Sequence, residues 1–135
     1  MSKALYAHGR NEFLVGDLDW LAHDIRMVLM DAADHTTDQA ADDNLDDIAS
    51  GARVATSDAF ASKTAVAGVA DAADVTFSSV TGDVSEELVI YYHTGTESTS
   101  TLIVNIDTAT GLAVTPNGGD ITVQWDSGAN KIFKL

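Results

Sequence analysis

The sequence predicts an all-β fold: an antiparallel β-sandwich, jelly-roll-like, with one or two short helices on its N-terminal side. Three strongly apolar runs, at residues 88–92, 102–106 and 121–125, recur in the last third of the chain. Each is rich in β-branched and aromatic side chains and is bounded by Gly, Ser, Thr, Asp or Asn, which is typical of buried strands. After Gly51 such runs recur at intervals of about ten residues, the spacing of an antiparallel sandwich.

The size and composition of the chain predict one domain covering residues 1–135. A chain of 135 residues and 14.2 kDa can form one hydrophobic core. No apolar run approaches the roughly 20 residues that a bilayer requires, so no membrane partner is expected. The first residues lack a basic region followed by an apolar stretch, so we expect no secretory signal and folding in the cytoplasm.

The first elements expected are a short helix and a strand. Residues 3–15 place apolar side chains at mixed helical spacing, and Gly16 and Asp17 form a plausible stop. Gly9 inside this helix costs about 1 kcal/mol relative to Ala, so a loop with a single turn is the alternative. Residues 25–30 form a compact apolar run, which predicts the first buried strand.

An acidic stretch follows, and the sequence predicts that it is a solvated excursion. Between residues 31 and 47 the chain carries seven aspartates and no basic residue. Residues 42–48 could form one or two helical turns there, with Leu45, Ile48 and Ala49 as a narrow apolar stripe and Gly51 as terminator. Such a helix would need to dock onto the sheet, because it is too short to be stable alone.

The remaining strands are expected at residues 53–57, 64–69, 74–80 and 131–135, in addition to the three apolar runs. Turns are expected at residues 116–120, where Asn and Gly tolerate positive φ, and at residues 126–130. The last run alternates lysine with apolar residues, which suits an edge strand whose charges discourage unwanted pairing.

The charge of the chain bears on its partners. It carries 21 acidic and 7 basic residues, a formal net charge of −14. Nucleic acid is therefore not expected as a partner, because binding to a phosphate backbone needs a clustered basic surface. The same charge favours cationic surfaces or divalent ions.

The strongest metal candidate is the set Asp42, Asn44 and Asp46, which occupies the first, third and fifth places of a calcium-loop pattern. The sixth place is Asp47 instead of Gly, and the twelfth is Arg53 instead of Glu. The sequence therefore excludes an EF-hand. A looser calcium site on these residues stays open as an alternative.

No pattern in the sequence predicts an enzyme or a cofactor. The four histidines lack the spacing of a helical zinc site, and the chain has no cysteine. A GxSxG nucleophile elbow and a phosphate-binding glycine loop are both absent. We therefore expect a non-enzymatic protein without a cofactor.

The aromatic residues offer two interpretations. Trp20 and Tyr92 could form a stacking platform for a glycan. The preferred interpretation places Trp125 in the core and one of the adjacent residues Tyr91 and Tyr92 at a subunit contact, because neighbours on a strand face opposite sides. The interface residues expected on this basis, together with the last strand, are Tyr91, Tyr92, Ile132, Phe133 and Leu135.

Several segments together resemble a family of small structural proteins of tailed bacteriophages. They include Gly9-Arg10, Phe13-Leu14 and Gly16-Asp17, and then residues 65–77, 94–96, 106–112, 116–119 and 125–135. The resemblance implies a virion protein assembled in the host cytoplasm that binds other virion proteins, such as major capsid, neck or fibre subunits. On this basis we expect a capsid decoration or a head and connector appendage. We expect a homo-oligomer, with a trimer favoured, because like subunits can cover the open edges of a small sandwich. The alternative is a virion adhesin or fibre protein that binds a host-surface glycan.

Overall fold

The computed structural model of the protein describes residues 3–129 and 131–135, which form three antiparallel sheets and one α-helix. The largest sheet has five strands in the order β1-β8-β7-β2-β3. Its strands are β1 (Lys3–Leu5), β2 (Ile25–Met30), β3 (Arg53–Thr56), β7 (Glu87–Tyr92) and β8 (Leu102–Ile106). The predicted β-rich, antiparallel class is confirmed.

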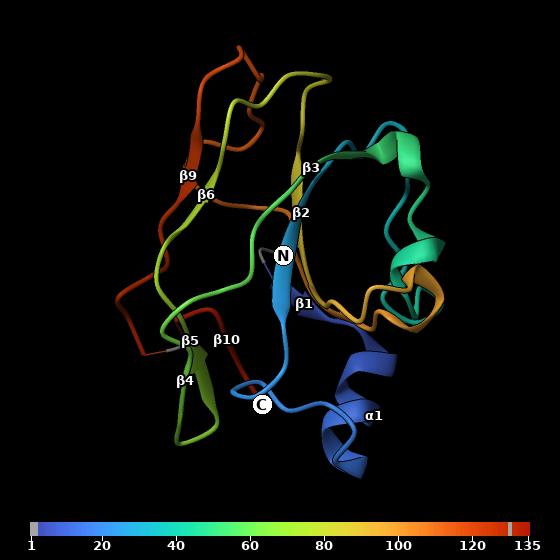
Figure 1. Cartoon of the computed structure of the whole chain (residues 1–135), viewed down its shortest axis with the longest axis vertical. Helices are drawn as coiled ribbons and strands as arrows, with labels where there is room; N and C mark the ends of the chain where they lie inside the picture. Colours follow the sequence, from blue (N-terminus) through green and yellow to red (C-terminus); the bar gives the residue numbers. More distant parts are fainter. Residues whose placement is uncertain (1–2, 130) are drawn as a thin grey trace.

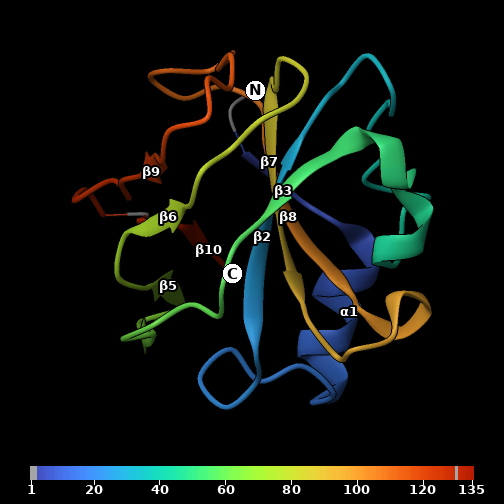
Figure 2. The ribbon, with the colours of Figure 1, turned by 45° about the horizontal axis from the view of Figure 1, so that its top comes forward.

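Two smaller sheets lie on one side of the large sheet (Figures 1 and 2). One joins β10 (Phe133–Lys134), β5 (Val69–Asp71) and β4 (Thr64–Val66), and the other pairs β6 (Val75–Phe77) with β9 (Ile121–Val123). Side chains from all three sheets share one hydrophobic core, among them Leu29, Ile90, Phe77, Ala70 and Phe133. This sharing makes the sheets one packed unit.

The opposite face of the large sheet is also covered, and this corrects the predicted solvated excursion. The segment after β2 carries the 3₁₀ turns η1 (Leu45–Asp47) and η2 (Ser50–Ala52), and it packs Leu45, Ile48 and Ala52 against the sheet. Ala49, expected on that apolar stripe, is exposed. The aspartates of this segment lie mostly outward, while its few apolar side chains close the second core.

Because both faces of the sheet are covered, its central strands are apolar without alternation. Strand β2 pairs with β7 over six residue pairs, from Ile25 opposite Tyr92 to Met30 opposite Glu87. Met27 and Leu29 face the first core, whereas Val28 and Met30 face the second. The predicted strand at residues 25–30 is confirmed with these same bounds.

The helix α1 (Ala7–Val15) is shorter than the predicted one. Residues 3–5 pair with β8 as strand β1 instead, and this long-range pairing leaves no local signature. Gly16 ends the helix in the left-handed conformation, at φ 82°, as expected of a C-terminal glycine. Gly9 is buried because the helix approaches β8 so closely that a methyl group there would overlap the carbonyl oxygen of Leu102.

The run at 102–106 forms β8 with the predicted bounds, whereas the remaining predicted strands form with different bounds. The run at 64–69 is a hairpin of β4 and β5 whose turn residues Ala67 and Gly68 have positive φ. The run at 131–135 contributes β10, which is an edge strand as predicted. The predicted turn at 126–130 extends onto residue 130, outside the described residues. None of the helices that the structure describes has the length and apolar character needed to cross a membrane.

Candidate functional site

Four segments of the chain meet around Trp20 and Phe133. The two rings pack edge to face with centroids 5.2 Å apart, and Phe13 of α1 lies 6.0 Å from Phe133. The Trp20 indole N–H donates to the carbonyl oxygen of Thr64 in β4, at 3.1 Å. The helix α1, the loop after it, the β4–β5 hairpin and β10 are therefore held together at one end of the molecule (Figure 1).

These four segments and the residue after β10 carry most of the large apolar side chains that the described residues expose. We call these five residues the apolar end: Leu14 (86% exposed), Val15 (59%), Leu21 (54%), Val66 (71%) and Leu135 (58%). A sixth exposed residue, Val84, is 41% exposed and belongs to the loop before β7. Exposed apolar side chains gathered on one part of a surface are typical of an interaction site.

The structure corrects most of the predicted interface. Tyr91, Ile132 and Phe133 are buried core residues, exposed by 2%, 0% and 5%. Tyr91 and Tyr92 do face opposite sides of the sheet, with Tyr91 in the second core and Tyr92 against the first. Of the last strand's predicted contacts, only Leu135 is available to a partner.

The predicted glycan platform at Trp20 and Tyr92 does not form. Trp20 is 5% exposed and packs between Phe60 and Phe133. The ring of Tyr92 stacks in parallel on His23, with centroids 4.2 Å apart, so one of its faces is already covered. Trp20 is therefore closed to a sugar and Tyr92 offers at most one ring face, so the two rings do not form the predicted platform.

The residues of the predicted calcium site do not come together. Asp42 and Asn44 form hydrogen bonds with other residues instead. A carboxylate oxygen of Asp42 lies 2.9 Å from the Nε2 atom of His35 and accepts the N–H of Asp38. Asn44 caps η1 in a reciprocal arrangement with Asp47, whose pKa is lowered because its carboxylate accepts the N–H groups of Asp43 and Asn44. Asp46 is exposed.

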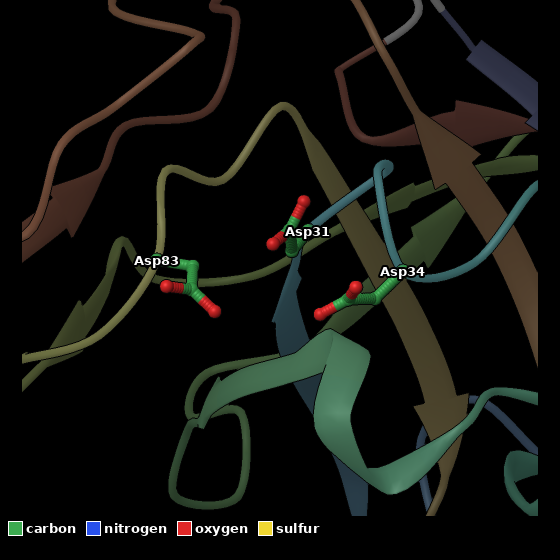
Figure 3. Close-up of side chains that lie close together, drawn as sticks. All are labelled: Asp31, Asp34 and Asp83. Atoms are coloured by element: carbon green, nitrogen blue, oxygen red, sulfur yellow. The ribbon is translucent and has the colours of Figure 1, made fainter.

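A different set of carboxylates comes together at the end of β2. Oxygen atoms of Asp31, Asp34 and Asp83 all lie within 4.8 Å of one another (Figure 3). Asp31 is 7% exposed, and its Oδ1 atom accepts the N–H of Ala33 at 2.8 Å. Calcium takes six to eight oxygen ligands, so three carboxylates alone do not complete a metal centre. The physical consequence of the cluster is mutual repulsion.

Polar side chains also lie beneath the segment that covers the second face. The Thr37 hydroxyl donates to the Glu87 carboxylate at 2.9 Å, and the Asn105 amide donates to the Thr37 oxygen at 3.4 Å. Burial raises the pKa of Glu87, and the nearby charge of Asp107 adds to this effect. Tyr6 is fully buried, and burial raises the pKa of its phenol far above the usual value. The phenol therefore stays protonated and is no base.

An open cleft of about 750 Å³ lies between the large sheet and β9. Leu29 and Leu88 belong to its apolar part, and Trp125 lines it while donating its indole N–H to the carbonyl oxygen of Ala73. Its polar lining consists of Thr110, Thr122, Gln124, Asp126 and Ser127. This combination offers an aromatic ring and uncharged hydrogen-bonding groups, with one carboxylate and no cation.

No protein-family model and no curated protein matches this chain.

Proposed function

We propose that this chain is a non-enzymatic structural subunit of a tailed-bacteriophage virion, which decorates the capsid or forms a head and connector appendage. The observation that carries the proposal is the apolar end, where Leu14 and Val66 are 86% and 71% exposed. Surfaces of this kind mark contacts between proteins. The phage-like segments of the sequence supply the virion context.

The negative charge of the chain means that association of like subunits depends on apolar contacts. At −14 per chain, like subunits repel one another, and burial of apolar surface offsets this repulsion. We propose a homo-oligomer, with a trimer favoured, that binds major capsid, neck or fibre subunits. We also propose that the sheets of this chain form a jelly-roll-like sandwich.

The test is the presence of the chain in purified virions. Mass spectrometry should find it in a fixed ratio to the major capsid protein, and Leu14→Asp combined with Val66→Asp should remove it from the particles. Val84→Asp is the matched control, because Val84 is exposed but lies outside the apolar end. Absence of the wild-type chain from purified particles would refute the proposal.

A second candidate function is a virion adhesin that binds a host-surface glycan. The Trp125 cleft favours it, because an aromatic face flanked by hydroxyl and amide groups suits an uncharged sugar. On a glycan array, binding that disappears in Trp125→Ala and persists in Trp20→Phe would support the adhesin. An array without binding would leave the structural subunit as the sole proposal.

A further inference from the structure

A groove runs between strands β1 and β10, which lie at the edges of two different sheets. It encloses about 440 Å³ and is lined by Lys3, Ala4, Leu5, Val104, Phe133, Lys134 and Leu135. Leu135 belongs to both this groove and the apolar end. The groove therefore adjoins the surface that we propose as an assembly contact.

Among the residues that the structure describes, each of these two edge strands has a hydrogen-bonded neighbour in its sheet on one side only. In an antiparallel pair, every second residue turns its N–H and C=O groups away from its partner strand. The Tyr6 N–H donates to Ile103 at 2.9 Å, so the alternation turns the groups of Lys3 and Leu5 away from β8. The Leu135 N–H donates to the carbonyl oxygen of Gly68 at 2.9 Å. The backbone N–H and C=O groups of the preceding residue, Lys134, therefore point away from β5.

The groove is also a place where positive charge gathers on an acidic protein. Lys3 and Lys134 line the groove, and Lys131 lies in the chain just before β10. Three of the 7 basic residues of the chain are therefore in or beside the groove. Lys131 pairs with Asp71 at 3.1 Å, and the Lys3 ammonium donates to the carbonyl oxygen of Lys131 at 2.5 Å. Lys134 is exposed and forms no ion pair with any residue that the structure describes.

We infer that this groove binds an extended segment of a partner protein in which acidic and apolar side chains alternate. The free backbone groups of the two edges bind its main chain, as in β-strand addition. Its apolar side chains pack on Leu5 and the exposed Leu135, and its carboxylates pair with Lys3 and Lys134. The inference rests on the proposed role in assembly, because it states the chemistry of a partner for that role.

A second copy of the chain fits the groove less well. Two copies that joined through these same edges would bring their lysines together, and like charges opposite each other on neighbouring strands are unfavourable. The lysines thus act against self-pairing and favour an acidic partner.

The test uses capped octapeptides and NMR spectroscopy of the full chain. One peptide alternates Glu with Val, a second alternates Lys with Val, and a third is the acidic peptide with alternate backbone amides methylated. Only the first should shift the amide resonances of Ala4, Leu5 and Lys134 at concentrations up to about 1 mM, and the shifts should diminish as salt is added.

A charge reversal then locates the contact. Lys134→Glu should weaken binding of the acidic peptide about tenfold, since it replaces attraction with repulsion. Arg10→Glu is the control, because Arg10 is exposed on α1 and does not line the groove. Equal effects of both variants would overturn the inference, as would equal binding of the basic or methylated peptide, or no binding at all.

Three further outcomes separate the hypotheses. Concentration-dependent shifts at the same residues without peptide would show that a second copy fills the groove, which overturns the inference of an acidic partner. If the acidic peptide fails while the chain is found in virions, the groove assignment falls and the structural role stands. If the peptide binds and virions lack the chain, the groove assignment stands and the virion role falls.

Discussion

The ring of Trp20 stands edge to face against the ring of Phe133, with the two planes at 88°. This packing anchors the last strand in the core, where Ile132 is 0% exposed and Phe133 is 5% exposed. The tail is therefore not free to cross onto a neighbouring subunit. Deletion of residues 131–135 should abolish folding, which circular dichroism measures.

Phe133→Ala should destabilise the protein by about 3–5 kcal/mol, because it removes a buried ring and leaves a cavity between Trp20 and Phe13. Urea unfolding followed by tryptophan fluorescence measures the change. Lys134→Ala, on the next and exposed residue, should change stability by less than about 0.5 kcal/mol. Equal stability of the two variants would contradict the packing described.

Gly9→Ala should destabilise the protein by about 1–3 kcal/mol, although alanine favours helices more than glycine does. The added methyl group would overlap the backbone carbonyl of Leu102, which cannot move without disturbing β8. Gly51→Ala is the matched control, since a methyl group there meets nothing within 4 Å. Chemical denaturation compares them, and a stabilised Gly9→Ala variant would show that α1 lies further from β8.

Asp34→Asn should raise the melting temperature at low ionic strength, in a buffer with a chelator. The substitution removes one of three carboxylates whose oxygen atoms lie within 4.8 Å of one another. The gain should diminish in about 1 M salt, where charges are screened. Asp126→Asn makes the same change in net charge outside the cluster and should have a smaller effect. A fall in melting temperature for Asp34→Asn would show that the carboxylate is stabilising.

Glu87→Gln should raise stability at pH 7, and the gain should shrink as the pH falls. Burial raises the pKa of Glu87, so the folded state favours the protonated form and is disfavoured when the carboxylate ionises. Below the raised pKa the wild-type side chain is already neutral, and the variant loses its advantage. Glutamine keeps the acceptor for the Thr37 hydroxyl.

Glu97→Gln provides a comparison of opposite sign. The hydrogen bonds and charge of Arg53 lower the pKa of Glu97, at distances of 2.9 and 3.0 Å. This variant should be less stable than wild type at pH 7, and the difference should vanish as the pH falls through the lowered pKa. Thermal melts of both variants from pH 3 to pH 7 test the two signs. If both variants changed stability in the same direction at pH 7, the direction of the pKa shift given for one of the two glutamates would be wrong.

The sequence predicted those elements that a short stretch of residues defines by itself. The apolar run of β2 and the stop at Gly16 are examples. Strand β1 was missed because only pairing with β8 defines it. The cluster of Asp31 and Asp83 could not be predicted either, because the two residues are far apart in the chain.

Tyr91 shows where the sequence contained a signal that the prediction did not use. Residues 88–91 are apolar without alternation, and such a strand is buried on both faces. A cover for the second face was therefore required, and Leu45 and Ile48 were apolar residues available for it. The apolar end was harder to predict, because Leu14 and Val66 are distant in sequence and only the packing around Trp20 brings their segments together.

The most direct test of the apolar end as an assembly contact is hydroxyl-radical footprinting of the isolated chain and of assembled virions. Leu14, Leu21 and Val66 are exposed in the isolated chain, and we predict that their oxidation falls sharply in the particle. Val84 serves as the internal reference and should be oxidised equally in both samples. If the apolar end is oxidised in the virion as readily as in the isolated chain, it is not an assembly contact, and the account is contradicted.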